Sequence, residues 1–572
     1  MRRTSGEPRR IVVVGGIGGG MSCAARARRL DEHAQIIVLE RGDRASVATC
    51  GLPYYIGGEI GDPASLEVQT PETLAASLRL DVRVGHEVIA LDPEARVLTV
   101  RSADGVATVA YDALVLSPGA LPTRPPLPGI DSPRVRTLRT IEDAERIRAD
   151  VATGARRAVV LGGGFVGLEV AEALRAQGLE VTLVELADRV LPTLEPELAA
   201  RVTRELARLG VVVRAGVAAT SIAHRADVDA VILADGTTLP ADLVVVSVGV
   251  RPDTRVFEAA GVACERGAIV VDAHGRTSVP SVWAVGDAVV SIDAVTGVAA
   301  PVPLAGPANR AGRLVADDIL RPEGARPLPA AIGTAVVRVG SLTVARTGAD
   351  HARLGARGID HQTIHLHPND HAGYFPGAHA IHLVVHFRAG DGLLLGAQAV
   401  GPSGVDKRID VLATAIRAGM TVADLIDLDL AYSPPYGQAK DAVNLAGMLG
   451  EDVLGGSVAL WYAADLPQVR ASSLMIDVRS PAEFAAGHLP DARNIPHTEL
   501  RDRIGEVIAA AAGRPVRLMC ASGFRSHLAH RVLAQHGIDS ATLSGGLITL
   551  VDAHGPDGDR LLVTDDVSRA AA

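Results

Sequence analysis

Two of the four cysteines in this 572-residue chain, Cys50 and Cys520, lie in segments that could perform thiol chemistry. Cys50 is surrounded by small residues in the segment SVATCGLPYY, and Cys520 begins the run CASGFRS. A thiolate attacks disulfides and accepts sulfane sulfur, so both residues are candidate nucleophiles. Cys23 and Cys264 belong to no such motif. We expect them to be inert thiols.

Cys50 has no second cysteine within a few residues, since the nearest, Cys23, lies far upstream. A redox dithiol is therefore excluded. A redox-active Cys50 would pair with an exogenous thiol or cycle as a lone thiolate. Taken alone, Cys50 would more simply be a small core side chain. Its position close to a nucleotide-binding module favours the redox role.

A first glycine-rich turn, GGIGGG, follows the apolar run Ile11–Val14 and precedes a helix-forming stretch. It departs from strict G-x-G-x-x-G because Ile17 takes the middle position, and the alternative is a merely tight turn. Glycines let the backbone approach a pyrophosphate, the helix N-terminus supplies N–H groups, and an acid at the end of the next strand binds ribose hydroxyls. We assign cofactor contacts to Gly15, Gly18, Gly20 and Glu40.

A second turn fits the G-x-G-x-x-G pattern and again stands between a strand and a helix. Its residues are Gly162, Gly164 and Gly167, and Glu185 closes the next strand. A carboxylate at that position repels a 2′-phosphate, which favours NADH over NADPH, although Arg189 lies nearby.

Two nucleotide modules suggest two cofactors that exchange a hydride. The later segment SVWAVGD is an apolar strand that ends in Gly286 and Asp287. A carboxylate there can meet the ribityl chain of a flavin, so the segment favours FAD in the first module and NADH or NADPH in the second. The alternative for these residues alone is an ordinary strand and turn.

The run CASGFRS lies between the predicted strand Val516–Met519 and a predicted helix. Loop N–H groups and the helix N-terminus would converge on Cys520, lower its pKa and hold the terminal sulfur of a persulfide as an anion. Arg525 would add positive charge or an ion pair that shapes the loop. A C-x5-S phosphatase loop has a similar shape but needs a general acid and a loop sized for phosphate.

Short Val/Ile/Leu runs alternate with helix-forming stretches up to about residue 325, which is typical of parallel α/β sheets. The pattern starts twice, at residues 11 and 158. Residues 330–450 alternate like an antiparallel sheet followed by a helix, and a new α/β unit begins near Leu474. The predicted strands are Ile11–Val14, Ile36–Leu39, Leu114–Leu116, Ala158–Leu161, Val181–Val184, Leu243–Val246, Val336–Val339, Thr363–His365, His382–Phe387 and Leu393–Ala399.

The sequence thus predicts an α/β protein with two Rossmann-like nucleotide-binding domains, an α+β domain and a C-terminal α/β domain. The predicted segments are 1–122 and 243–328 for FAD, 123–242 for NAD(P)H, 329–452 for the α+β domain, 453–464 for a linker and 465–572 for the last domain.

The net charge of −10 and the pI near 6.0 argue against general nucleic-acid binding. No apolar run is long enough for a membrane helix, and Ile11–Val14 indicates a strand rather than part of a signal peptide. We therefore expect a cytoplasmic protein. The histidine run over residues 361–371 lacks the cysteine or carboxylate spacing of a metal site, so no metal is predicted.

Residues 11–450 resemble the flavin-dependent pyridine nucleotide-disulfide oxidoreductases, specifically the single-cysteine branch that includes coenzyme A-disulfide reductase. The segments that carry the resemblance are SVATCGLPYYIGG, LSPGA, LGGGFVGLEV, VWAVGDA, HAGYFPGA, GVDKRIDVLATAI and AYSPPYGQAKDAVN. CASGFRS, with IDVR, EF, GHLP and SGG, resembles the rhodanese family.

The first resemblance implies that residues 329–452 form a dimerisation domain, and thus a homodimer in which Cys50 is the redox cysteine and Tyr374 and Tyr432 act near the flavin and the thiol. It also implies coenzyme A contacts, which fall on Ser22, Arg26, Arg29, Ser46, Thr49 and Lys440, whereas a contacting His of the family is replaced by Asn309. Only two of the 56 basic residues are lysines, Lys407 and Lys440. An ammonium group binds phosphate as a point charge, so we assign Lys440 as a ligand and expect Lys407 to pair with Asp406 or Asp410.

Together these features predict an FAD-dependent NAD(P)H oxidoreductase that reduces coenzyme A disulfide, persulfides or polysulfides through Cys50, with Cys520 and Arg525 handling sulfane sulfur. Two alternatives remain. One is an NADH oxidase, although the position of the first turn that is His in the related peroxidases and oxidases is Gly18 here. The other is a redox-sensing interaction protein without multiple turnovers.

Overall fold

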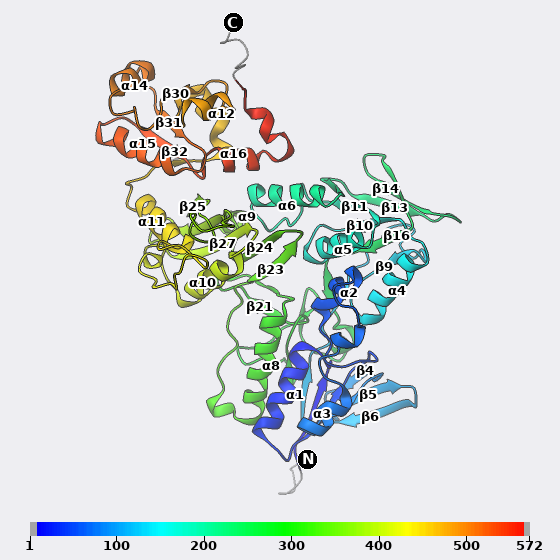
Figure 1. Cartoon of the computed structure of the whole chain (residues 1–572). Helices are drawn as coiled ribbons and strands as arrows, with labels where there is room; N and C mark the ends of the chain where they lie inside the picture. Colours follow the sequence, from blue (N-terminus) through cyan, green and yellow to red (C-terminus); the bar gives the residue numbers. More distant parts are fainter. Residues whose placement is uncertain (1–7, 565–572) are drawn as a thin grey trace. The chain divides into compact units, whose positions relative to one another are not determined.

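The computed structural model describes residues 8–564, and the chain divides into two compact units (Figure 1). The first unit runs to Leu186 and resumes over Gly210–Gly333. The second contains Ala187–Leu209 and the chain from Thr334 onward. Residues 187–209, part of the segment expected to bind NAD(P)H, thus group with the second unit.

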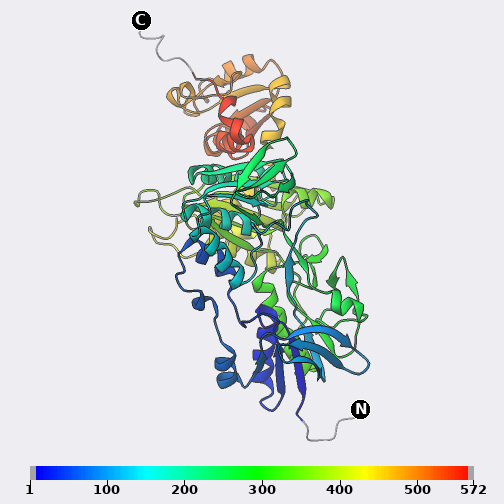
Figure 2. The same ribbon diagram turned by 90° about the vertical axis from the view of Figure 1, so that its right-hand side faces the viewer.

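The first sheet of the first unit is parallel and follows the order β20-β7-β1-β2-β3. Its strands are Val282–Ala284, Ala113–Leu116, Arg10–Val14, Gln35–Leu39 and Asp81–Arg83. One face is covered by α1 (Gly18–Leu30) and α8 (Ala305–Leu320), which lie side by side in Figures 1 and 2. The other face packs against the antiparallel sheet β4-β5-β6, whose strands are Glu87–Asp92, Val97–Ser102 and Gly105–Ala110. Burial on both faces explains the continuous apolar runs.

The second parallel sheet of this unit follows the order β12-β11-β10-β16-β9, and α5 (Phe165–Ala176) follows β10. Its strands are Val211–Ala215, Glu180–Glu185, Arg157–Leu161, Leu243–Val246 and Val135–Arg136. A small antiparallel sheet, β13-β14-β15, packs on it with strands Ala219–Ala223, Asp229–Leu233 and Thr238–Ala241. All six parallel strands predicted in the first 250 residues are therefore confirmed as sheet strands of this unit.

The second unit contains an antiparallel sheet in the order β23-β24-β27-β26-β25, with strands Ala335–Val339, Leu342–Gly348, Leu394–Gly401, His382–Arg388 and His361–Leu366. The helices α10 (Val405–Ala418) and α11 (Ala442–Leu454) cover its apolar face. The four predicted strands and the predicted helix are confirmed. Sequence reasoning missed β24, because its segment LTVARTG carries no regular alternation.

The C-terminal sheet of the second unit is parallel and follows the order β28-β32-β31-β29-β30, with strands Leu460–Trp461, Ser540–Leu543, Val516–Met519, Leu474–Asp477 and Arg493–Asn494. The helices around it are α12 (Leu466–Ser472), α13 (Pro481–Ala485), α14 (Ile504–Ala511), α15 (Phe524–Gln535) and α16 (Gly546–Ala553). The short strand β28 lies within the stretch predicted as a linker, where two residues give no pattern.

The helix α6 (Pro196–Arg208) belongs to the second unit and packs against α16 (Figure 1). Arg201 and Arg204 of α6 both pair with Asp552 of α16. None of the helices in the described part of the chain is long and apolar enough to cross a membrane.

Candidate functional site

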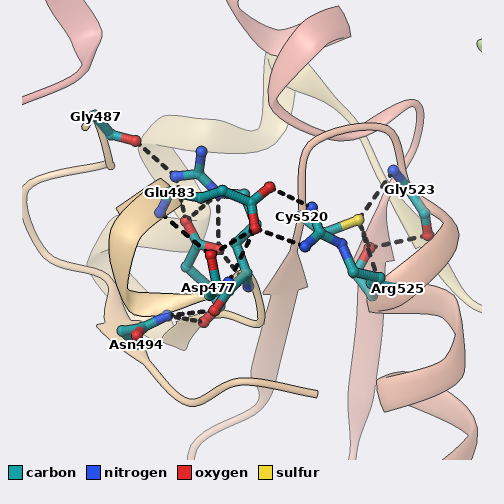
Figure 3. A network of polar contacts seen from close by, with 10 residues as sticks. Asp477, Glu483, Gly487, Asn494, Cys520, Gly523 and Arg525 are labelled. Atoms are coloured by element: carbon teal, nitrogen blue, oxygen red, sulfur yellow. Dashed lines mark hydrogen bonds and ion pairs between the residues drawn. The ribbon is translucent and has the colours of Figure 1, made fainter. Parts of the chain in front are cut away.

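The Cys520 loop joins β31 to α15 and surrounds the sulfur with hydrogen-bond donors (Figure 3). Cys520 Sγ accepts from the backbone N–H of Gly523 at 3.2 Å and from the N–H of Ser526 at 3.4 Å. It also lies 3.4 Å from the Ser526 hydroxyl, whose proton it shares with the Gly523 carbonyl at 3.0 Å. Gly523 has a φ of +95°, which favours glycine at this sharp turn into α15. Three convergent donors can hold a thiolate or the terminal sulfur of a persulfide. The loop thus has the geometry that the run CASGFRS predicts.

Ser526 is a site residue that sequence reasoning assigned no role. Its side chain is fully buried, and its Oγ accepts a hydrogen bond of 2.7 Å from the hydroxyl of Thr542 on β32. This bond holds the Ser526 hydroxyl beside the sulfur. The last residue of the CASGFRS run could have suggested the contact, whereas its Thr542 partner comes from a different strand.

Arg525 forms an ion pair rather than offering a free positive charge to the sulfur site (Figure 3). Its two terminal nitrogens donate to the two carboxylate oxygens of Glu483, each at 2.7 Å. These hydrogen bonds from Arg525 are the main cause that lowers the pKa of Glu483 to about 2. Of the two roles predicted for Arg525, the structure favours the ion pair that shapes the loop.

The segment IDVR, residues 476–479, is held by a buried ion pair between Asp477, which Figure 3 labels, and Arg479. Arg479 donates to Asp477 through its backbone N–H and its guanidinium, and it also donates to the Gly487 carbonyl at 2.6 Å. Asn494 donates to the carbonyls of Asp477 and Arg479. A buried charge pair requires such saturation of its hydrogen bonds. The network connects β29, β30 and the end of α13.

A turn formed by Ser544, Gly545 and Gly546, called here the 544–546 turn, lies directly against the Cys520 loop. The N–H of Leu547 donates to the Cys520 carbonyl at 2.9 Å, and the N–H of Ile548 donates to the Ala521 carbonyl at 3.0 Å. A Cβ atom on Gly546 would lie 2.5 Å from the Cys520 carbonyl oxygen, so only glycine fits. The turn fixes the backbone that carries the sulfur.

Cys50 is exposed and lies in the first unit, on a single 3-10 turn (Thr49–Gly51) that leads into α2 (Leu52–Gly57). Ser46, which precedes this turn, donates its N–H to the carbonyl of Gly16 at 2.8 Å. The chain around Cys50 is therefore bound to the first glycine-rich turn, as the pairing of a thiol with a nucleotide module requires.

The first glycine-rich turn fits a dinucleotide. Gly15 has a φ of +99°, and a Cβ on Gly20 would lie 2.0 Å from the Gly15 carbonyl oxygen, so α1 approaches the turn closely. Among residues 8–564, no side chain caps the start of α1 at Gly18, which leaves its first N–H groups for an anion. Glu40 accepts from Gly16 N–H at 2.8 Å.

Asp287 directly follows Gly286 after β20, in the first unit with this turn. Gly286 has a φ of +85°, and burial raises the pKa of Asp287 above its ordinary value. The six residues assigned to FAD thus all lie in the first unit, namely Gly15, Gly18, Gly20, Glu40, Gly286 and Asp287.

The second glycine-rich turn repeats this geometry in the sheet that contains β10 and β11. A Cβ on Gly167 would lie 1.9 Å from the Gly162 carbonyl oxygen, and α5 begins after Gly164 without a side-chain cap from the described residues. Glu185, at the end of β11, accepts from Gly163 N–H at 2.5 Å. These residues would hold the NAD(P)H pyrophosphate and ribose.

Three of the residues assigned to coenzyme A lie on α1 at spacings that share one helix face, namely Ser22, Arg26 and Arg29. The Ser22 hydroxyl donates to Asn309 of α8, and Arg26 pairs with Asp317 at 2.7 Å. Ser46 and Thr49 belong to the Cys50 segment of the same unit, whereas Lys440 lies in the second unit just before α11.

The structure brings Tyr374 and Tyr432 together from two loops of the second unit. Their hydroxyl oxygens lie 3.1 Å apart, and the hydrogen bond from Tyr432 raises the pKa of Tyr374. Both rings are exposed.

The prediction that Lys407 pairs with Asp406 or Asp410 is wrong, since no ion pair of Lys407 occurs among the described residues. The side chain is partly exposed on α10, so water can satisfy its ammonium group.

The remaining cysteines are unsuited to nucleophilic chemistry. Burial raises the pKa of Cys23 to about 12, and burial also raises the pKa of Cys264 above its ordinary value. No cluster of histidine, cysteine and carboxylate side chains in residues 8–564 could hold a metal ion.

Comparisons with known proteins place these sites in a family. Residues 9–303 match the family of pyridine nucleotide-disulphide oxidoreductases, residues 334–443 match its dimerisation domain, and residues 460–548 match the rhodanese-like domain. The chain belongs to the pyridine nucleotide-disulphide oxidoreductase family. It is thus a flavin-dependent oxidoreductase with FAD and NAD(P)H as cofactors and a C-terminal rhodanese domain, as the sequence predicts.

The family members most informative for this chain have names that refer to sulfur chemistry. The chain is 33% identical to a coenzyme A disulfide reductase of Staphylococcus haemolyticus over 449 residues, which cover 78% of this chain and 100% of that protein. It is similar to the structure of reduced Bacillus anthracis CoADR-RHD, with 39% identity, a TM-score of 0.93, and coverage of 96% of this chain and 98% of that one.

Two further solved structures are similar to this chain, one at higher sequence identity than the other. A NAD-dependent persulfide reductase from A. fulgidus has 35% identity, a TM-score of 0.88, and coverage of 94% of this chain and 99% of that one. A water-forming NADH oxidase from Lactobacillus brevis has 26% identity and a TM-score of 0.75, over 78% of this chain and 99% of that one. The oxidase is thus the more distant relative in this family.

Proposed function

We propose that this chain is a homodimeric NADH-dependent reductase of coenzyme A disulfide and coenzyme A persulfide, in which Cys50 performs the exchange chemistry and Cys520 receives sulfane sulfur. The observation that carries the proposal is the set of three donors directed at Cys520 Sγ in a chain that also bears an exposed Cys50 beside a dinucleotide turn. The names of the relatives, which refer to coenzyme A disulfide and to a persulfide, support these substrate classes.

The Cys50 thiolate attacks one sulfur of the disulfide, forms a mixed disulfide with coenzyme A and releases the other coenzyme A as a thiolate. With a persulfide, the same attack on the inner sulfur releases hydrosulfide. FAD, which the first glycine-rich turn would hold, would supply the two electrons from NADH that reduction of the mixed disulfide requires. The balance per turnover is one NADH and one proton for two thiols, or for one thiol and hydrogen sulfide.

The Cys520 thiolate takes the outer sulfur of a persulfide and releases the donor as a thiol. The N–H groups of Gly523 and Ser526 and the Ser526 hydroxyl then stabilise the bound sulfur anion. The bidentate pair of Arg525 with Glu483 keeps the loop in this conformation. The coenzyme A contacts assigned to Ser22, Arg26, Arg29, Ser46, Thr49 and Lys440 are part of the proposal.

NADH is the proposed reductant because Glu185 stands at the ribose position of the second module and Arg189 is engaged by Asp188 at 2.8 Å. The matched dimerisation domain supports a homodimer in which Tyr374 and Tyr432 act near the partner's thiol. Four free cysteines suit a reducing compartment such as the cytoplasm.

Steady-state NADH oxidation with coenzyme A disulfide, coenzyme A persulfide, polysulfide and oxygen as acceptors tests the proposal. We expect turnover with the disulfide or the persulfide, and loss of both in Cys50→Ser. Dominant oxygen consumption would instead assign an NADH oxidase. A single flavin reduction without further turnover would assign a sensor.

A further inference from the structure

His365 of β25 and His367, which follows this strand, contact the rhodanese domain at the 544–546 turn. His365 Nδ1 lies 2.8 Å from the Ser544 hydroxyl, and His367 Nε2 lies 3.1 Å from the Gly545 carbonyl oxygen and 3.0 Å from Thr549 Oγ1. All of these residues belong to the second unit. The dimerisation domain therefore touches the segment that backs the Cys520 loop.

The hydrogen-bond partners of His365 define its role. Its Nε2 lies 2.8 Å from a carboxylate oxygen of Glu197 on α6, and a carboxylate can only accept, so Nε2 carries the proton. In the neutral ring Nδ1 then accepts from the Ser544 hydroxyl. The His365 side chain is only 10% exposed, and a Cβ on Gly545 would lie 2.7 Å from the His365 Cβ. The ring thus packs on the turn as well as bonding to it.

His367 is fixed in the same way. Its Nε2–H donates to the Gly545 carbonyl, so its Nδ1 accepts from His382 Nδ1–H at 2.8 Å. Burial, aided by Arg201, lowers the pKa of His367 to about 3 and that of His382 to about 2, so both rings are neutral at ordinary pH. A neutral pair leaves each ring nitrogen one defined role.

The turn that these histidines hold is continuous with the sulfur site. Leu547 and Ile548, which follow it, donate to the carbonyls of Cys520 and Ala521. Gly546 contacts the same carbonyls so closely that a Cβ atom would lie 2.5 and 2.6 Å from their oxygens. A shift of the turn would thus move the backbone that directs the donors at Cys520 Sγ.

We propose that His365 and His367 are positioning residues for the Cys520 site, which hold the 544–546 turn from the dimerisation domain so that the Cys520 loop keeps its three donors on the sulfur. The proposal deepens the function proposed above, because it concerns the same sulfur-accepting site. It makes the reactivity of Cys520 depend on residues outside the rhodanese domain.

The test is the rate at which iodoacetamide alkylates Cys520 in the full-length holoenzyme, followed by peptide mass spectrometry over a range of pH. Alkylation follows the thiolate fraction, so His365→Ala and His367→Ala should each slow it about three- to tenfold near neutral pH and move its pH profile upward. His365→Gln, whose amide can still accept from Ser544 and donate to Glu197, should recover most of the rate.

The matched control is His361→Ala. His361 lies on β25 on the same face as His365, but its ring bonds to His351 and to the Ile359 carbonyl. This variant should leave Cys520 unchanged, and labelling of Cys50 in the same samples should be unchanged in every variant, because Cys50 lies in the first unit.

Ser544→Ala removes the His365 bond from the other side, so it should slow Cys520 alkylation as His365→Ala does, and the double variant should add little. This pair keeps the test decisive even if one variant folds poorly. An unchanged Cys520 pH profile in His365→Ala, His367→Ala and Ser544→Ala would overturn the positioning role. The alkylation rate does not depend on sulfur transfer, so failure of the proposed function alone would appear as normal labelling without transfer activity.

Discussion

The two candidate nucleophiles of this chain have opposite surroundings. Cys50 is exposed on a single turn beside a dinucleotide-binding turn, whereas Cys520 is 1% exposed and receives three hydrogen bonds. An exchanging thiol must admit a bulky disulfide and release a thiolate. A sulfur-carrying thiol must stabilise the anionic terminal sulfur of its persulfide until the acceptor binds. One chain can thus separate these tasks by the burial of each thiol and the placement of hydrogen-bond donors around it.

Replacing either cysteine should have a large effect on one of the two activities, disulfide reduction or sulfur transfer, and little on the other. Cys50→Ser should lower NADH-dependent disulfide reduction on the order of 10³-fold or more, because the nucleophile is removed, and should leave sulfur transfer from thiosulfate to cyanide intact. Cys520→Ser should do the reverse. Parallel assays of both activities in both variants measure this, and loss of both activities in either variant would contradict the division of tasks.

A smaller effect should follow from breaking the loop ion pair. Arg525→Lys loses the two-pronged bond to Glu483, so we expect roughly tenfold slower sulfur transfer at Cys520. Disulfide reduction through Cys50 should stay within about twofold of the parent rate, since the pair lies in the other unit. A matched control is Arg503→Lys, whose pair with Glu506 is remote from the sulfur in sequence and exposed.

Removing one donor should cost less than losing the loop conformation. Ser526→Ala deletes one hydroxyl donor to Cys520 but keeps the N–H groups of Gly523 and Ser526. One such bond contributes about 1 kcal/mol, which predicts a roughly fivefold decrease in the transfer rate. If the decrease equalled that of Cys520→Ser, the hydroxyl would have a chemical role beyond stabilising the sulfur.

A further effect concerns pH and two buried histidines at the contact between the dimerisation and rhodanese domains. Burial lowers the pKa of His367 to about 3 and that of His382 to about 2. Below about pH 6.5 the two rings are therefore protonated in the unfolded chain but remain neutral in the folded chain. Stability should therefore fall as the pH drops from about 6.5 toward 3, by about 1 kcal/mol per histidine over the first pH unit.

Thermal unfolding of the parent chain and of His382→Gln, compared near neutral pH and about one unit below 6.5, measures this effect. The glutamine cannot titrate, so the variant should lose less stability than the parent over that interval. Equal losses would show that groups other than His382 dominate the acid response over that interval.

Much of the fold follows from local patterns. The runs that became β1, β7, β10 and β16 are continuously apolar because both faces of a parallel sheet are covered. The strands β24 and β28 escaped prediction because one lacks alternation and the other has two residues that depend on β32. Their pairing energy comes from neighbours that are distant in sequence.

The residues that can do chemistry are recognisable from the sequence, because glycine turns and the CASGFRS run encode their geometry within a few residues. Their partners are visible only in the folded chain: Glu483 for Arg525, Thr542 for Ser526, and His365 for Ser544. Such partners are separated by many residues and meet only when strand register and domain packing are set. Local sequence carries no signal for a contact whose geometry is fixed by the packing of other segments.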